Sequence, residues 1–443
     1  MGIHKSIFQV LENLAGDSPS VVNEDPQGIR LDAEQLAVIE AVKRRESVLV
    51  TGPAGTGKSA VLEHLCKILP VAVTSTTGLS AVNIGGVTIH SWSGMGIGGD
   101  PDAVLQKVSG YVRDRINNTQ YLAIDEISML GGSGIDLLHF ILSSVRCDRR
   151  PFGGMVMIFF GDFMQLPPVD DEEMAFESMA WQELNPRIIN LTRIYRQDDP
   201  KFQNMLNEIR LGKIGEESAT LLASRINISD DDPEREPLHL YPTNKSVDRE
   251  NHMRVSQLPG EMVTYLAEDW AQHPVQLANM KKSCRWPELL ELKVGARVML
   301  LFNKDVENGL ANGSMGLVRD IRGPEGVIVV EFDIGPGVMV EIRRGTFEIR
   351  QMEKMYGSWT STVVATRKQH PLRLAYALTA HKSQGLSLDK VRVHLAGCFD
   401  AGQAYVALSR VRTLNGLFIG DFEKGCIRAN RAARRYYGGI QTS

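Results

Sequence analysis

The hydrophobic pattern between residue 31 and about residue 191 alternates between two kinds of segment. Short runs in which nearly every residue is apolar are separated by stretches long enough to form helices. The apolar runs are residues 47–51, 71–73, 121–124 and 155–160. Strands that are hydrophobic on both faces and connected through helices are typical of a parallel sheet with helices on both sides. We therefore predict an α/β domain over residues 31–190.

A second α/β region is predicted over residues 191–285 and 372–443, and its two parts are separated by a different pattern. The intervening chain has short strand-like runs joined by Asn-Gly and Gly-Pro turns, at residues 296–301, 316–321, 327–332 and 338–342. Asn-Gly between apolar runs is a strong signal for a β-hairpin. We predict a small antiparallel, SH3-like barrel over residues 286–371, inserted into the second α/β domain. Residues 1–30 are expected to be an N-terminal leader with one short amphipathic helix.

Composition narrows the class of protein. The chain has 443 residues, of which 43% are hydrophobic and 23% are charged, and this mixture excludes both a small disulfide-stapled fold and a disordered chain. Its 49 Lys and Arg against 53 Asp and Glu give a net charge of -4. This balance argues against a protein that coats nucleic acid through bulk positive charge, although it permits a local basic groove.

Cysteine usage and hydropathy predict where the protein works. Five widely spaced cysteines without a Cys-x-x-Cys pair indicate reduced thiols. No apolar run approaches the ~18 residues that a membrane span requires. We expect a protein of the cytoplasm, in the bacterial or phage cytosol or nucleoid, that has no membrane partner.

The strongest chemical motif is GPAGTGKS at residues 52–59. It follows a predicted strand and precedes a predicted helix. Its glycines let the backbone N–H groups face nucleotide phosphates at a helix N-terminus, while Lys58 reaches the β- and γ-phosphates and Ser59 ligates magnesium. The expected cofactors are ATP and Mg²⁺.

Two further strands deliver polar residues to the edge of the predicted sheet where the phosphate loop lies. YLAIDEISML at residues 121–130 ends its apolar run in Asp125 and Glu126, and MVMIFFGD is followed by Gln165. We predict that Asp125 holds the metal ion and that Glu126 is the general base toward the attacking water. Gln165 is a candidate for contact with the γ-phosphate or the water.

The motifs, in this order, resemble those of the Pif family of superfamily 1, whose members are 5′-to-3′ DNA helicases related to the RecD-like helicases. The resemblance extends from residue 31 to about residue 417. Besides the phosphate loop, it rests on TSTTGLSAVNIGGVTIHSW at 74–92, IDEISML at 124–130, RRPFGGMVMIFFGDFMQLPPV at 149–169, LTRIYRQ at 191–197, LAYALTAHKSQGLSLDKV at 374–391 and YVALSRVR at 405–412.

The resemblance implies an α/β fold of two RecA-like P-loop domains with parallel sheets, the inserted β-barrel in the second lobe and a short wedge loop in the first, at residues 93–118. ATP would lie between the lobes. Arg196 and Arg410 would reach the γ-phosphate from the second lobe, and Gln35 would read the adenine. Gln384 and Gly385 would couple the DNA and ATP sites. The complete predicted nucleotide site is Gln35, Gly52, Pro53, Ala54, Gly55, Thr56, Gly57, Lys58, Ser59, Ala60 and Gly385.

The resemblance also implies a path for single-stranded DNA across the tops of both lobes. The matching residues are Thr77, Gly78, His90 and Trp92 in the first lobe, and Thr243, Asn244, Thr379, His381, Lys382 and Ser383 in the second. Trp92 could stack on a base, worth ~1–3 kcal/mol, and the alternative is a core aromatic beneath the loop. The arginines near the end of the chain either touch nucleic acid or form a solvated face.

We therefore expect an ATP-dependent helicase that moves 5′ to 3′ on single-stranded DNA and unwinds forked or tailed duplexes. G-quadruplex DNA and RNA–DNA hybrids are further candidate substrates, and a monomer is expected. Two alternatives stay open. One is a translocase that mainly strips proteins from DNA, and the other is a nucleotide-switched DNA-binding scaffold.

Overall fold

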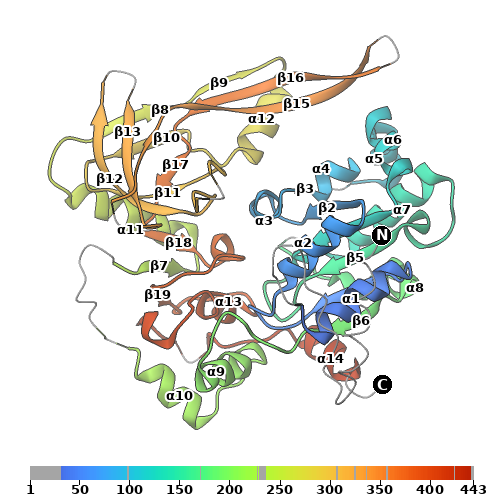
Figure 1. The fold of residues 1–443 in the computed structure, drawn as a ribbon, viewed down its shortest axis with the longest axis horizontal. Coiled ribbons are helices and arrows are strands. Elements are labelled where there is room, and N and C mark those ends of the chain that lie inside the picture. The colour runs from blue at the N-terminus through green and yellow to red at the C-terminus, as the bar shows by residue number, and fades with distance from the viewer. Residues whose placement is uncertain are drawn as a thin grey trace, which may run out of the picture.

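The computed structural model describes residues 31–96, 99–169, 171–226, 228, 236–305, 308–323, 326–335, 337–355, 358–423 and 425–440. Two lobes lie side by side, and a β-rich region lies against the second lobe at the top of Figure 1. The predicted leader at residues 1–30 falls outside the described residues. Of the helices within the described ranges, none has both the length and the apolar character needed to cross a membrane.

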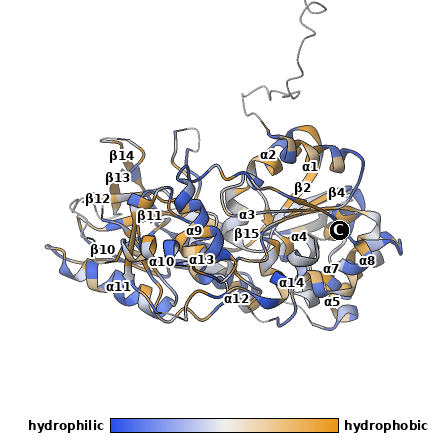
Figure 2. Ribbon diagram, turned by 90° about the horizontal axis from the view of Figure 1, so that it is seen from below, coloured by the Kyte–Doolittle hydropathy of each residue, from blue (hydrophilic) through white to orange (hydrophobic). Residues whose placement is uncertain are grey.

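The first lobe is built on a six-stranded parallel sheet. In spatial order its strands are β3 (Val87–Thr88), β2 (Val71–Ser75), β4 (Tyr121–Asp125), β5 (Val156–Phe160), β1 (Val48–Thr51) and β6 (Arg187–Asn190). Every residue of β1 and β5 is buried, because helices cover both faces of the sheet. Figure 2 shows the hydrophobic colour along β2 and β4. The four predicted apolar runs coincide with β1, β2, β4 and β5, and the parallel α/β fold is confirmed.

The helices of the first lobe begin where the sequence provides caps. The main ones are α1 (Ala33–Lys43), α2 (Lys58–Ile68), α3 (Gly78–Asn83), α4 (Ile89–Ser93), α7 (Gly132–Arg146) and α8 (Met179–Leu184). Asp32 and Gln35 form a capping box at the start of α1. Gly57, with a left-handed φ of 82°, ends the phosphate loop and lets α2 begin at Lys58.

The segment predicted as a short wedge loop, residues 93–118, is helical for most of its length. It forms α5 (Pro101–Lys107) and α6 (Gly110–Asn118). Asp100 caps α5 ahead of Pro101, and Ser109 caps α6. The prediction of a loop was wrong, because both capping residues and Pro101 favour helices within this glycine-containing segment.

The second lobe carries a four-stranded parallel sheet. Its strands, in spatial order, are β18 (Ala377–Thr379), β7 (Leu238–Tyr241), β19 (Val391–His394) and β20 (Leu417–Asp421). The helices that accompany this sheet are α9 (Pro200–Arg210), α10 (Glu216–Ala223), α11 (Asn244–Gln257) and α13 (Gln403–Leu408). A hydrophobic core of strand residues and residues of α9 and α13 holds the lobe together.

The inserted region is antiparallel, as predicted, but it begins earlier than residue 286. A five-stranded sheet contains β14 (Met339–Ile342), β13 (Val327–Phe332), β12 (Met315–Arg322), β11 (Arg297–Leu300) and β17 (Leu372–Leu374). A separate pair joins β8 (Val263–Leu266) to β10 (Leu289–Leu292) around the same core. The four predicted strand-like runs coincide with β11 to β14.

A long hairpin in the inserted region was not predicted. It consists of β15 (Gly345–Met355) and β16 (Ser358–Gln369), and β16 also pairs with β9 (Glu268–Ala271) beside α12 (Pro274–Ser283). The hairpin extends over the first lobe (Figure 1). There, Trp359 Nε1 donates to Asp114 Oδ2 of α6 at 2.9 Å, and the Tyr111 ring lies 5.6 Å from the Trp359 ring. The inserted region therefore contacts both lobes.

The last helix, α14 (Arg431–Ile440), was assigned to the second lobe but packs on the first. Ala433 is fully buried in the core of the first lobe, where Tyr436 and Tyr437 also pack. Arg431, Arg434 and Arg435 lie on the exposed face of the helix. The assignment was wrong because the apolar face of α14 finds its complementary surface beside α8 (Figure 1).

Candidate active site

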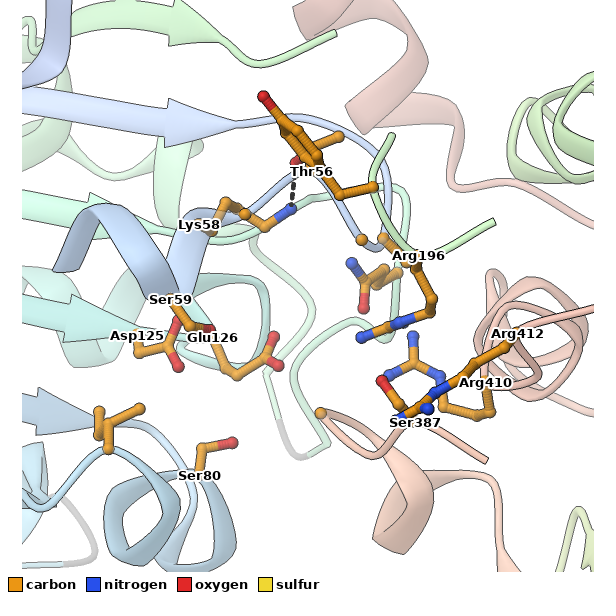
Figure 3. A pocket seen from close by; sticks show the side chains of 17 residues that line it. Thr56, Lys58, Ser59, Ser80, Asp125, Glu126, Arg196, Ser387, Arg410 and Arg412 are labelled. Atoms are coloured by element: carbon orange, nitrogen blue, oxygen red, sulfur yellow. Dashed lines mark hydrogen bonds between the residues drawn. The ribbon is translucent and has the colours of Figure 1, made fainter. Parts of the chain in front are cut away.

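A cavity of about 540 Å³ lies between the lobes (Figure 3). Its first-lobe wall contains residues 54–59 of the phosphate loop together with Asp125, Glu126 and Gln165. The opposite wall contains Arg196, Gly385 and Arg410. The structure thus brings together predicted residues that lie hundreds of positions apart in the chain.

The phosphate loop adopts a conformation that requires glycine. Gly52, Gly55 and Gly57 have φ values of 138°, 84° and 82°, where other residues are strained. A Cβ on Gly55 would lie only 2.5 Å from Arg196 Cβ. Lys58 Nζ donates to the carbonyl oxygens of Gly52 and Pro53 at 2.8 and 2.9 Å. Burial lowers the pKa of Lys58 to about 8, against the opposing effect of nearby carboxylates. An anion bound in the loop would therefore stabilise the charged ammonium.

Asp125 and Glu126 follow β4 at the edge of the cavity. Glu126 has a φ of 53°, an uncommon conformation for a non-glycine residue that turns its side chain into the space between the lobes (Figure 3). Burial, and then the charge of Glu126, raise the pKa of Asp125 to about 7. A cation beside Asp125 would favour its carboxylate form.

A magnesium ion fits the donors present here. Ser59 and Asp125 line the same cavity, and a hydroxyl with a carboxylate is a typical protein contribution to Mg²⁺ bound by nucleotide phosphates. Within the described residues there is no cluster of three or more His, Cys, Asp or Glu side chains that could hold a metal ion. The ion would therefore need the phosphates as additional ligands.

The two arginines are fixed by the backbone of the second lobe. Arg196 Nη1 donates to the Ser409 carbonyl at 3.1 Å. Arg410 is 2% exposed, and it donates from Nε to the Val406 carbonyl at 2.8 Å and from Nη2 to Ser409 Oγ at 2.9 Å. Burial, and then the charge of Arg196, lower the pKa of Arg410. Two neighbouring guanidinium groups held in this way suit a highly charged anion.

Direct contacts tie the two walls of the cavity together. The Ala54 N–H group donates to the Tyr405 hydroxyl at 2.8 Å, and Gln384 Nε2 donates to Glu126 Oε2 at 2.7 Å. Gln384, a residue of the predicted coupling element, therefore contacts the predicted general base Glu126. Nearby, Arg210 makes two 2.8 Å hydrogen bonds to the buried carboxylate of Asp162.

Sequence reasoning missed several residues that line the cavity or close it. Tyr405 was missed, as were the lining residues Tyr195, Ser387 and Arg412. Each lies inside a motif that the sequence displays, a few positions from a predicted residue. The motifs therefore contained these residues, but the sequence did not show that their side chains point toward the cavity.

The two predicted glutamines differ in position. Gln165 lines the cavity. Gln35 is buried beside the phosphate loop and is not among the lining residues; its Nε2 donates to the Thr56 carbonyl at 3.3 Å, and its Oε1 accepts from the Asp32 N–H group at 3.1 Å. Ala60 lies in α2 and is likewise outside the lining. In this structure Gln35 supports the loop, and its adenine contact stays a prediction.

Most of the predicted DNA residues lie at accessible positions. Thr243 and Asn244, which begin α11, are exposed, while Thr77, Gly78, His90, His381 and Lys382 are half-buried. Lys382 Nζ donates to Asn244 Oδ1 at 3.0 Å. In the first lobe, the Thr76 hydroxyl, next to Thr77, donates to the Glu126 carbonyl at 2.9 Å. The candidate DNA residues are thus connected to the catalytic edge of the sheet.

Three of the predicted DNA residues are turned inward. The Trp92 side chain is 3% exposed and belongs to the core of the first lobe, and Arg115 lies over its ring. A base cannot stack on a covered ring, so the alternative of a core aromatic describes this structure. Ser383 is fully buried and donates to the Ala380 carbonyl, and Thr379 is 4% exposed. The Ser383 and Thr379 side chains support the loop from within, and the contact of these two residues with DNA stays a prediction.

Family models and curated relatives similar to this chain are Pif1-type helicases. The family model for PIF1-like helicases matches residues 30–220, and the model for the 2B domain of DNA helicase Pif1 matches residues 277–321. The ATP-dependent DNA helicase PIF1 of Xenopus laevis is 36% identical over 427 residues, covering 94% of this chain. This chain spans 65% of the length of that relative.

Solved structures agree over nearly the whole chain. The crystal structure of the Pif1 helicase from Candida albicans has a TM-score of 0.83 and 34% identity, covering 93% of this chain and 100% of that one. The Bacteroides Pif1 helicase in complex with ADP-AlF3 and ssDNA has a TM-score of 0.70 and 29% identity, covering 94% of this chain and 98% of that one. With the phosphate loop, the acid pair and the two arginines assembled around one cavity, these matches place the chain in the PIF1-like helicase family.

Proposed function

We propose that this protein is an ATP-dependent DNA helicase that translocates 5′ to 3′ on single-stranded DNA. The observation that carries the proposal is the composition of the cavity between the lobes. Lys58 and Glu126 on the first lobe face Arg196 and Arg410 on the opposite wall. Charge on a transferring phosphoryl group needs fixed cations, and cations delivered from a second lobe make hydrolysis depend on closure.

Each residue then has a separate chemical task. Glu126 accepts a proton from the attacking water, and the hydrogen bond from Gln384 orients its carboxylate. Arg196 and Arg410 stabilise the negative charge of the γ-phosphate. Lys58 binds the β- and γ-phosphates from the phosphate loop.

Magnesium completes the proposed site. Ser59 and Asp125 would hold it, and when bound it would supply positive charge to the phosphate oxygens. The exposed ring of Tyr195, which lines the cavity, offers an aromatic surface for the nucleotide base.

Coupling to DNA rests on two short connections. Gln384 directly follows the predicted DNA segment 379–383 and bonds Glu126, and Thr76 precedes Thr77 and bonds the Glu126 backbone. A shift of the strand at either segment would therefore move the general base. The relative from Bacteroides was crystallised with ADP-AlF3 and ssDNA together, which supports simultaneous binding here.

The decisive experiment measures ATP hydrolysis and strand separation with duplexes that carry either a 5′ or a 3′ single-stranded tail, in ATP and magnesium. We expect single-stranded DNA to stimulate hydrolysis and only the 5′-tailed duplex to be unwound. Movement without strand separation would favour a translocase that strips proteins from DNA. Hydrolysis indifferent to DNA would favour a nucleotide-switched scaffold.

Finer expectations belong to the same proposal. Forked duplexes, G-quadruplexes and RNA–DNA hybrids are candidate substrates, and the protein is expected to act as a monomer in the cytosol. Unwinding assays with each substrate and light scattering of the DNA complex would test these expectations separately.

A further inference from the structure

Three cations gather where the second lobe faces the first. Arg285 follows α12, Arg373 lies in β17, and Lys382 lies in the turn after β18. Burial lowers the pKa of Lys382, and the charges of Arg373 and Arg285 lower it further. Desolvation by the surrounding protein, and then the charge of Arg373, lower the pKa of Arg285. These three groups are therefore close enough to repel one another.

The cluster lies between predicted DNA residues of both lobes. Arg285 Nη2 lies 3.6 Å from the position that a Cβ on Gly78 would occupy, at the start of α3 in the first lobe. Lys382 Nζ donates to Asn244 Oδ1 at the start of α11 in the second lobe. In Figure 1, α12 of the inserted region lies above α3 of the first lobe. A strand that follows the predicted DNA residues from one lobe to the other would pass these cations.

The cluster has little compensating negative charge. In the part of the chain that the structure describes, neither the Arg285 nor the Arg373 side chain forms a hydrogen bond or an ion pair. By contrast, Arg210 forms an ion pair with a buried aspartate, and Arg367 does so with Asp269. Burial lowers the pKa values of Arg373 and Lys382, and the charge of Asp248 on α11 opposes this shift in both. Asp248 is exposed, and among the described residues it forms no ion pair with Arg373 or Lys382.

The side chains are also reachable from solvent. Arg285 is exposed, and Arg373 and Lys382 are half-buried. Three neighbouring cations with unused donors, at an accessible boundary, match the needs of a phosphodiester backbone. Guanidinium groups in particular bind phosphate through two parallel hydrogen bonds.

We propose that Arg285 and Arg373 join Lys382 in a phosphate-binding site for single-stranded DNA at the boundary between the lobes. The inference rests on the proposed function and adds two residues that the motifs do not contain. Arg285 comes from the inserted region and lies against Gly78 of the first lobe. A phosphate held there is bound by cations of the second lobe and its insertion while it lies against Gly78 of the first lobe, so opening of the lobes would change the surroundings of this site.

Salt-dependent binding tests the site. The affinity of a short fluorescent oligothymidylate is measured by anisotropy over a series of potassium chloride concentrations, for the unaltered chain, Arg285→Gln and Arg373→Gln. Each variant should bind roughly tenfold more weakly at low salt, the expected loss for a hydrogen bond to a charged group. Each should also flatten the plot of log affinity against log salt by about 0.7, the value for one phosphate on a single strand.

Three further variants sharpen the result. Asp248→Asn removes the opposing carboxylate and should tighten binding several-fold. Arg285→Lys keeps the charge but loses the planar fork, so it should retain the salt slope and lose part of the affinity. Lys201→Gln removes an equal charge from α9, where Lys201 pairs with Glu217, and should leave binding unchanged. Thermal unfolding of each variant checks that it is folded.

The outcomes separate this inference from the proposed function. If the unaltered chain does not bind the oligonucleotide, the proposed function and the inference fall together. If it binds, but folded Arg285→Gln and Arg373→Gln keep its affinity and salt slope, only the inference is overturned. An equal loss in Lys201→Gln would also overturn it, because general charge would then explain the effect.

Discussion

The Tyr437 hydroxyl lies 2.6 Å from Thr51 Oγ1, and this contact joins the last helix to the residue that precedes the phosphate loop. The same hydroxyl accepts a hydrogen bond from the Phe163 N–H group at 3.1 Å. Tyr436 stacks on Phe176 with a centroid distance of 4.3 Å. The chain thus returns from the second lobe and packs α14 against the first, which adds a connection between the lobes outside the nucleotide cavity.

Tyr437→Phe should destabilise the protein by about 1–3 kcal/mol, because Thr51 and Phe163 would lose a buried hydrogen-bond partner. Denaturation by urea would measure the change. Tyr436→Phe is the matched comparison, since its hydroxyl accepts a single 3.3 Å bond from Trp181 Nε1 and its loss should be smaller. Equal effects in the two variants would argue against a special role for the Thr51 contact.

Glu126→Gln should retain ATP and DNA binding while hydrolysis falls by about 10²–10⁴-fold, the usual contribution of a general base. The amide oxygen can still accept the hydrogen bond from Gln384, so the geometry is kept while proton acceptance is lost. Steady-state turnover and fluorescent-nucleotide binding would measure the two effects separately. Near-normal turnover in this variant would refute the assignment of Glu126.

Arg410→Ala should lower turnover far more than nucleotide affinity, because its charge acts mainly on the transition state. A loss of roughly 10³-fold or more in turnover is expected for an arginine of this type. Because Arg410 is buried, Arg410→Lys serves as the less disruptive companion variant. Comparable losses of affinity and turnover would indicate a role in binding instead.

A pH effect on stability is expected from two histidines of the second lobe. His394 Nε2 lies 3.2 Å from His239 Nδ1, and His394 Nδ1 lies 2.7 Å from Asp421 Oδ2. Burial lowers the pKa of His239 from 6.5 to about 4; the charge of Glu250 opposes this shift, and that of His394 adds to it. The unfolded chain therefore binds a proton that the folded chain does not, and stability falls as the pH drops from about 6.5 toward 4.

His239→Gln should remove this dependence. Between pH 7 and pH 5, the free energy of unfolding of the unaltered chain should fall by roughly 2 kcal/mol more than that of the variant. Urea denaturation at both pH values measures the difference, with His252→Gln on the exposed face of α11 as the control. An identical pH dependence in His239→Gln and the unaltered chain would contradict the prediction.

The candidate site was largely predictable because its chemistry is encoded in short segments. A phosphate loop needs its glycines, its lysine and its serine within residues 52–59, and a catalytic acid needs only a position at the end of a buried strand. Arg196 and Arg410 became candidates only through the resemblance to the Pif family, because their local segments alone do not distinguish them from surface arginines. The directions of the Trp92 and Ser383 side chains could not be predicted. A sequence motif does not reveal which face of a short helix or turn is buried.

The sequence by itself determined the parallel α/β fold, the order of the motifs and the phosphate loop with the acid pair Asp125 and Glu126, since these follow from local periodicity and local backbone geometry. The tertiary structure alone decided that α14 packs on the first lobe, that the β15–β16 hairpin reaches α6, and that Arg285 lies beside Gly78. Each of these depends on surfaces that only exist once distant segments have folded. Short-range patterns carry no information about which of several apolar or charged faces will meet.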